Sequence, residues 1–307
     1  MKKGRPSLTA EGVAALRAAE STRAERERIC YDPFAKDFLS FKFSILIKYR
    51  LIRKIALWVV ERIVPGLAGD IIGRVRYIDD CLKSCINHGL EQLVILGAGY
   101  DSRAYRYDEL RNGFKVFELD HPATQKVKVD KVKKILGSLS PHVVYIPIDF
   151  NKDNLEDKLF EKGYDKNLKT FFIWEGVTMY LSAEAVDKTL DFVARNSRQG
   201  SSIIFDYIFK AFLDETIKVE GIEQIELVKR AYERVDAPYT GEHFTFGIPE
   251  GTVVEFLSQR GFHQVKEVTG EYLKDTYFQG VNSNRKVLYV CGFVHATVVP
   301  KNYPSKR

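Results

Sequence analysis

The chain has 307 residues, 45% of them hydrophobic, so a fold of this size can bury a large core without disulfide or metal staples. Its 21 glycines and 10 prolines are too few for a collagen-like or low-complexity chain, and its net charge of +6 is spread without the concentrated basic face that nucleic-acid binding requires. Composition therefore excludes disorder, a fibre and a small disulfide scaffold, and no basic face argues for nucleic-acid binding, so we expect no nucleic-acid partner.

The N-terminal third is expected to be helical. Thr9 is a plausible N-cap for a helix that Asp32-Pro33 ends, and helical patterns resume over 34–63 and about 70–88. We expect residues 1–88 to form a helical cap. Four cysteines occur in the chain, and their spacing lacks the two close pairs of a metal ribbon. They indicate buried thiols, no metal site and a reducing, cytoplasmic compartment.

The most membrane-like stretch runs from Phe41 to Gly69. It is too often interrupted by charge to span a bilayer, which takes about 20 mostly apolar residues, so we expect no stable membrane insertion. Two interpretations remain: a basic amphipathic helix on a membrane surface, or a helix that covers a cleft or core, which we favour. The interrupting residues are Lys48, Arg50, Arg53, Lys54, Glu61 and Arg62.

Residues 89–307 show strands alternating with helices, which is typical of βαβ units in a parallel sheet. Residues about 210–248 are charged and irregular and are expected to form a lid inserted over one end of the sheet. Two final strands, about 263–273 and 286–298, are expected to be joined by a polar turn as an antiparallel hairpin at the sheet edge. The first parallel strand is expected to end at Gly97, and the other four are expected to cover 114–120, 143–150, 169–177 and 201–209.

A glycine-rich turn follows the first of these strands. Gly97-Ala98-Gly99 lets backbone N–H groups and a helix N-terminus approach a ligand closely. Acids then mark the ends of the later strands: Glu118 and Asp120 end the second, Asp149 the third and Glu175 the fourth. A carboxylate about 20 residues beyond the glycines can accept hydrogen bonds from a ribose. Together these groups predict an adenosine-like ligand across the strand tips.

Two classes of enzyme suit this layout, an oxidoreductase with a dinucleotide cofactor and a methyltransferase. A dinucleotide site, as in an NAD(P)-dependent oxidoreductase, prefers a third glycine at the place that Ser102 occupies. The two strands after the last helix suit a seven-stranded methyltransferase sheet better.

The segments GAGYDSRAYR, FELDHP and WEGVTMYL resemble the S-adenosylmethionine-dependent methyltransferases of the leucine carboxyl methyltransferase family, and in particular their bacterial and archaeal branch. The resemblance covers about residues 7–210. It implies an α/β fold of class I: a Rossmann-like, seven-stranded, mostly parallel sheet with an N-terminal helical cap and an inserted lid. It also implies S-adenosylmethionine as the cofactor.

The resemblance further implies how the cofactor is held. Arg76 should bind the carboxylate of its methionine part, unless Arg76 pairs with Asp79 or Asp80 along its own helix and Arg74 takes the role. The other contacts implied are Arg17 as a second basic group, Gly97 and Gly99 against the methionine part, Asp120 or else Glu118 on the ribose, Asp149 and Phe150 on the adenine, and Glu175 on the ammonium.

The reaction expected is attack by an acceptor oxygen on the activated methyl group. A carboxylate acceptor is already ionised at neutral pH and needs no general base, whereas a hydroxyl needs one. Tyr180 and His243 are the candidate catalytic residues, and the aromatic residues of the lid suggest a small, partly apolar acceptor. A non-catalytic S-adenosylmethionine-binding protein remains an alternative, and nothing indicates the oligomeric state.

Overall fold

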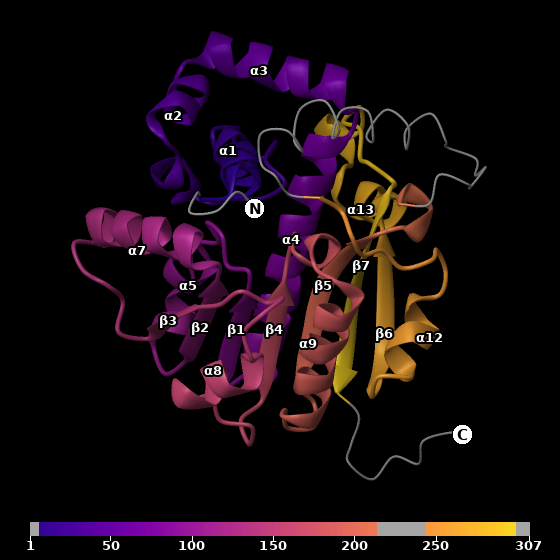
Figure 1. Ribbon diagram of the computed structural model, residues 1–307. Helices are drawn as coiled ribbons and strands as arrows, with labels where there is room; N and C mark the ends of the chain where they lie inside the picture. The colour runs from indigo at the N-terminus through magenta and orange to yellow at the C-terminus, as the bar shows by residue number, and fades with distance from the viewer. Residues whose placement is uncertain (1–5, 214–242, 299–307) are drawn as a thin grey trace.

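The computed structural model describes residues 6–213 and 243–298. Seven strands form one sheet in the order β3-β2-β1-β4-β5-β7-β6, with helices on both faces (Figure 1). The first five strands are mutually parallel, and β7 runs antiparallel to both β5 and β6. The predicted α/β fold is therefore confirmed. The strands are β1 (Gln92–Leu96), β2 (Lys115–Asp120), β3 (Val143–Pro147), β4 (Thr170–Trp174), β5 (Ser202–Ile208), β6 (Phe262–Thr269) and β7 (Cys291–Val298).

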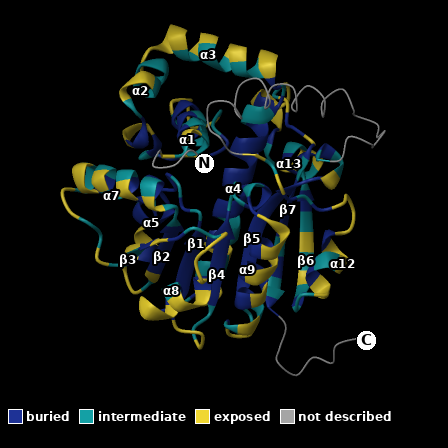
Figure 2. Cartoon of the chain, in the orientation of Figure 1, coloured by how far each residue is buried: buried dark blue, intermediate teal, exposed yellow. Residues whose placement is uncertain are grey.

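The central strands are mostly apolar because helices cover both of their faces. Every residue of β1, β4 and β5 is buried (Figure 2). Alternate residues of one strand enter different cores: Leu93 and Ile95 pack on one face, and Val94 and Leu96 on the other. The described helices after β1 are α5 (Arg103–Arg106), α6 (Asp108–Arg111), α7 (Pro122–Leu136), α8 (Leu155–Glu161), α9 (Ala183–Arg195), α12 (Val253–Ser258) and α13 (Gly270–Tyr277).

The N-terminal segment is helical, as expected, but its boundaries differ from the prediction. The first helix is capped by Ser7, whose hydroxyl accepts a hydrogen bond from the Ala10 amide at 3.1 Å, and not by Thr9. The predicted continuous segment 34–63 consists of a short 3₁₀ turn and two helices. The elements are α1 (Leu8–Ser21), η1 (Ala35–Phe38), α2 (Phe41–Lys48), α3 (Arg50–Ile63) and α4 (Leu67–Asn87). Within the described residues, no helix is both long and apolar enough to cross a membrane.

The connection between the last two strands was predicted wrongly. β6 ends at Thr269, and the chain then forms α13 instead of continuing as a strand to 273. Thr269 caps that helix, since its hydroxyl accepts a hydrogen bond from the Tyr272 amide at 3.3 Å. The antiparallel pairing of the two strands at the sheet edge agrees with the prediction. Most of the expected lid, residues 214–242, lies outside the described residues.

Candidate cofactor and acceptor site

A cavity of about 1100 Å³ lies where the carboxyl ends of the parallel strands meet the N-terminal helices. Strand ends and the segments that follow them form its polar part. Side chains of α2, α3 and the segments near Phe244 and Leu288 form an apolar part. Of the predicted site residues, those that line the cavity are Arg17, Gly97, Gly99, Asp120, Asp149, Phe150, Glu175, Tyr180 and His243.

The turn after β1 depends on glycine. Gly97 has a φ of +70°, and a Cβ there would lie 2.2 Å from Cγ2 of Val177, so that no other residue fits without displacing its neighbour. Gly99 also has a positive φ, and its amide donates a hydrogen bond to the Asp120 carboxylate. The His121 amide donates to the same carboxylate at 2.6 Å. Asp120 is thus fixed at the end of β2, directly beside the turn.

Glu175, after β4, is held between two buried guanidinium groups. Its Oε1 accepts a hydrogen bond from Nε of Arg74, and its Oε2 from Nη1 of Arg103, both at 2.9 Å. Burial by itself raises the pKa of Glu175, but the two positive charges outweigh it and hold the pKa below its usual range. Glu175 therefore presents an ionised carboxylate to the cavity.

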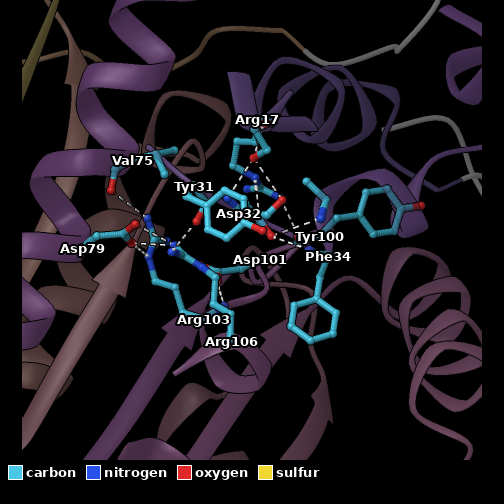
Figure 3. A network of polar contacts seen from close by, with 12 residues as sticks. Arg17, Tyr31, Asp32, Phe34, Val75, Asp79, Tyr100, Asp101, Arg103 and Arg106 are labelled. Carbon is cyan, nitrogen blue, oxygen red and sulfur yellow. Dashed lines mark hydrogen bonds and ion pairs between the residues drawn. The ribbon is translucent and has the colours of Figure 1, made fainter. Parts of the chain in front are cut away.

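A network of buried charges surrounds Arg103 and Asp79 (Figure 3). Asp79 of α4 accepts hydrogen bonds from Nε of Arg103 at 2.7 Å and from Nη2 of Arg106 at 2.6 Å. Arg17 of α1 pairs with Asp32 at 3.0 Å and donates to the backbone carbonyl of Tyr100 at 2.5 Å. These contacts tie α1 and α4 to the segment that follows the glycine turn.

Two predicted residues lie elsewhere. Arg76 is exposed, pairs with Asp80 at 3.0 Å and does not line the cavity. The buried Arg74 lines it instead, because residues two apart on a helix point about 200° apart. Glu118, the alternative ribose ligand, is fully buried away from the cavity, where Nζ of Lys128 lies 2.8 Å from its carboxylate.

Sequence reasoning missed two buried acids. Asp206 of β5 accepts hydrogen bonds from Nη1 of Arg74 and from the Gly176 amide, both at 2.6 Å. A charged residue inside an apolar strand needs a buried partner, and that signal could have identified it. Asp70 of α4 lines the cavity, and burial raises its pKa to about 7 despite the nearby Arg74. Its Oδ1 has no hydrogen-bond partner within the described parts of the chain.

Comparison with known sequences settles the family. The sequence model of the leucine carboxyl methyltransferase family matches residues 10–194. The chain belongs to this family. The Bacillus subtilis protein named "Putative S-adenosyl-L-methionine-dependent methyltransferase YktD" is 28% identical over 96% of this chain and 99% of its own length. A Mycobacterium avium protein named "Putative S-adenosyl-L-methionine-dependent methyltransferase" is 31% identical over 64% of each chain.

A solved structure shows the same fold. A DUF574 family protein from Streptomyces avermitilis superposes with a TM-score of 0.57 at 10% identity, over 94% of this chain and 97% of its own. The family model and the descriptions of the relatives, rather than the shared fold, show that this member of the leucine carboxyl methyltransferase family is an enzyme that uses S-adenosylmethionine as the methyl donor. The sequence-based expectation of a methyltransferase is confirmed, and the oxidoreductase alternative is set aside.

The apolar part of the methyltransferase's cavity contains both candidate catalytic residues. The Tyr180 ring lies 5.3 Å from the Phe244 ring, centre to centre. His243 is exposed at the start of the second described segment. Within residues 6–213 and 243–298, no cluster of side chains could hold a metal ion. The apolar lining includes Phe43, Leu46, Ile47, Leu57, Val60, Phe212, Leu288 and Val290.

Proposed function

We propose that this methyltransferase transfers the methyl group to an oxygen atom, a carboxylate or a hydroxyl, of a small and partly apolar acceptor. One observation carries the proposal: a single cavity joins charged strand ends to an apolar chamber between α2, α3 and the segment near Phe244. The polar part suits the cofactor, and the apolar chamber suits the hydrocarbon part of an acceptor.

The polar part fits the methionine end of S-adenosylmethionine, which carries one carboxylate and one ammonium. Arg74 has the fork geometry that pairs with carboxylates, and within the described residues its Nη2 makes no hydrogen bond, while Nε and Nη1 are used. We assign it the carboxylate, with Arg17 as the second basic contact. The ionised Glu175 suits the ammonium.

The remaining contacts follow the strand order. Asp120 at the end of β2 lies beside Gly99 and suits the ribose hydroxyls. Asp149 and Phe150, after the neighbouring β3, line the same cavity and suit the adenine. Gly97 and Gly99 leave room for close approach of the ligand to the backbone, because neither carries a side chain.

The chemistry then depends mainly on alignment. When bound, the cofactor supplies an activated methyl group, and the chain's residues hold the acceptor oxygen in line with it, which contributes roughly 7–11 kcal/mol to lowering the barrier. A carboxylate acceptor is ionised without help. A hydroxyl acceptor requires a base, for which the cavity offers Tyr180, His243 and the buried Asp70, whose pKa of about 7 suits proton transfer at neutral pH.

The test uses S-adenosylmethionine tritiated on its methyl group and a panel of amphiphilic carboxylic acids, alcohols, amines, thiols and carbon nucleophiles, each assayed separately. A methyl ester releases tritiated methanol in mild alkali, whereas a methyl ether or amine retains its label. We expect alkali-labile product from at least one carboxylic acid, or a stable ether from an alcohol. Transfer only to nitrogen, carbon or sulfur would contradict the proposal. A Tyr180→Phe and a His243→Ala variant show whether either side chain contributes.

A further inference from the structure

The helix α3 has an outer surface that nothing in the described protein covers. α3 runs along the edge of the molecule farthest from α8 (Figure 1), and neither α2 nor α3 contains a buried residue (Figure 2). Leu51 is 70% exposed, Ile55 54% and Trp58 63%. We call the exposed apolar residues Leu51, Ile52, Ile55, Trp58 and Val59, with Phe41 and Tyr49 at the α2 end, the outer face.

The opposite side of the same helix is already occupied. Ala56, Leu57 and Val60 of α3 line the cavity, and this contact accounts for the apolar residues on the inner side of the helix. A surface helix of a soluble protein usually carries polar residues on its second side. Apolar residues on both sides of α3 therefore indicate that the outer face has a partner of its own.

The charges around the outer face indicate what that partner is. Between Phe41 and Val64 the acidic residue is Glu61, which accepts a hydrogen bond from the Gly66 amide. Arg53 lines the cavity, but two other cations of the same stretch lie by the aromatic rings of the outer face: Lys48 is 5.8 Å from the Tyr49 ring and Arg62 is 5.8 Å from the Trp58 ring. Within the described chain, none of the following exposed cations pairs with a carboxylate: Lys42, Lys48, Arg50, Lys54 and Arg62.

We propose that the outer face docks on the surface of an anionic lipid bilayer. Aromatic and aliphatic residues flanked by cations are the composition of helices that lie in the membrane interface. Each cation near a negatively charged leaflet contributes about 1 kcal/mol of attraction. Because the inner side of α3 lines the cavity, docking places the cavity directly beneath the lipid.

The experiment measures co-sedimentation of the full-length protein with vesicles of phosphatidylcholine, or of equal parts phosphatidylcholine and phosphatidylglycerol. We expect binding to the anionic vesicles and little to the neutral ones. A second readout is intrinsic fluorescence, because the chain has two tryptophans and Trp174 is fully buried. Anionic vesicles should therefore shift the emission of Trp58 to the blue.

Paired variants test whether vesicle binding depends on the outer face or only on the overall charge and hydrophobicity of the protein. Lys54→Glu with Arg62→Glu should weaken binding to anionic vesicles roughly tenfold or more. Lys162→Glu with Lys166→Glu changes the net charge equally and should weaken binding far less, because Lys162 caps the C-terminal end of α8 and α8 lies at the opposite end of the molecule from α3 (Figure 1). Leu51→Ser with Trp58→Ser should also reduce binding, whereas Val254→Ser with Val281→Ser, two exposed valines elsewhere, should not.

Three results would overturn the proposal. The first is no binding to anionic vesicles, and the second is equal loss in the variants and their controls. The third is a dimer in sedimentation velocity that Leu51→Ser with Trp58→Ser dissociates, since the outer face would then join two copies of the chain. None of these readouts needs turnover or an acceptor, so they leave the proposed methyl transfer untouched.

Discussion

Glu175 accepts hydrogen bonds from two guanidinium groups, and one of these, Arg74, also pairs with Asp206. Buried charges of this kind are stable only as a set, because removing one partner leaves another charge desolvated and unpaired. A substitution that keeps the charge but loses the planar fork is therefore more informative than alanine.

We predict that Arg74→Lys weakens S-adenosylmethionine binding by about 1.5–3 kcal/mol, the range for hydrogen bonds to charged groups. Arg76→Lys is the matched control: it lies two residues away on the same helix and pairs with Asp80 outside the cavity, so it should leave the affinity unchanged. Isothermal titration calorimetry measures both. A loss of affinity in Arg76→Lys alone would restore the assignment made from sequence.

Asp70 should make stability depend on pH. Burial raises its pKa to about 7, whereas an unfolded chain leaves an aspartate near about 3.9. Between these values the folded protein retains a proton that the unfolded chain has lost, so the stability due to this group is present at low pH and is lost as pH rises through about 7. Asp70→Asn removes this titration.

The wild type should therefore lose stability relative to Asp70→Asn by on the order of 3 kcal/mol between about pH 4 and pH 8. Urea unfolding of both proteins at several pH values measures the difference. Acids far from Asp70 titrate in both proteins alike, so the comparison reports Asp70 together with its coupling to Asp206 and Glu175. A difference that stays constant across this range would show that Asp70 titrates normally.

Sequence alone predicted most of the residue types that line the cavity, but for arginine it favoured the wrong one of two neighbouring residues. The motif contains Arg74 and Arg76, and only the phase of α4 decides between them: Arg74 lies one turn before Ile78, a buried residue, and Arg76 one turn before Asp80, which is not. The apolar spacing of Ile71, Val75, Ile78 and Leu82 already marks the buried side of α4, and Arg74 lies next to that side. Glu118 is a different case, because its pairing with Lys128 of α7 is a tertiary contact that the local sequence does not show.

At the scale of elements, α4 is held by close backbone contact as well as by side chains. A Cβ on Gly69 would lie 1.9 Å from the Lys286 carbonyl oxygen, and the Gly66 carbonyl accepts a hydrogen bond from the Leu288 amide at 3.1 Å. The start of the helix that carries Asp70 and Arg74 thus packs directly on the segment before β7. Its position sets one wall of the cavity.

We predict that Gly69→Ala lowers the free energy of unfolding by about 1–3 kcal/mol, or more if the backbone cannot yield. Gly12→Ala in α1 is the control, because its Cβ would meet nothing within 4 Å. Alanine stabilises a helix interior by roughly 0.5–1 kcal/mol over glycine, so this variant should be slightly more stable. Urea unfolding without ligand measures both, and equal effects would argue against the close contact at Gly69.

The elements themselves were mostly predictable, because long apolar runs and helical periodicity depend on local sequence. The failure at α13 has a local cause as well. The apolar residues after Phe262 continue past the end of β6, whereas the cap at Thr269 lies in the middle of the predicted strand. A capping threonine followed by Gly270 and Glu271 is the signal that could have ended the strand there.

At the scale of the whole molecule, the proposed cofactor contacts come from distant parts of the chain. Arg17 belongs to α1, Gly97 follows β1, Asp149 follows β3 and Glu175 follows β4. The buried bond from Arg17 to the Tyr100 carbonyl already links α1 to the glycine turn. A ligand that contacts all of these segments must therefore stabilise the N-terminal helices together with the sheet.

We predict that S-adenosylmethionine slows amide hydrogen exchange in α1 and in the segments after β1, β3 and β4, while α8 and α12, which contribute no residue to the cavity, remain unchanged. At a ligand concentration about 100 times the dissociation constant, the stabilisation is about 2.7 kcal/mol, which is large enough to detect in exchange rates of segments that open with the ligand site. NAD at the same concentration serves as the control and should protect neither region. Protection confined to the strand ends, with α1 exchanging as before, would mean that Arg17 does not contact the cofactor.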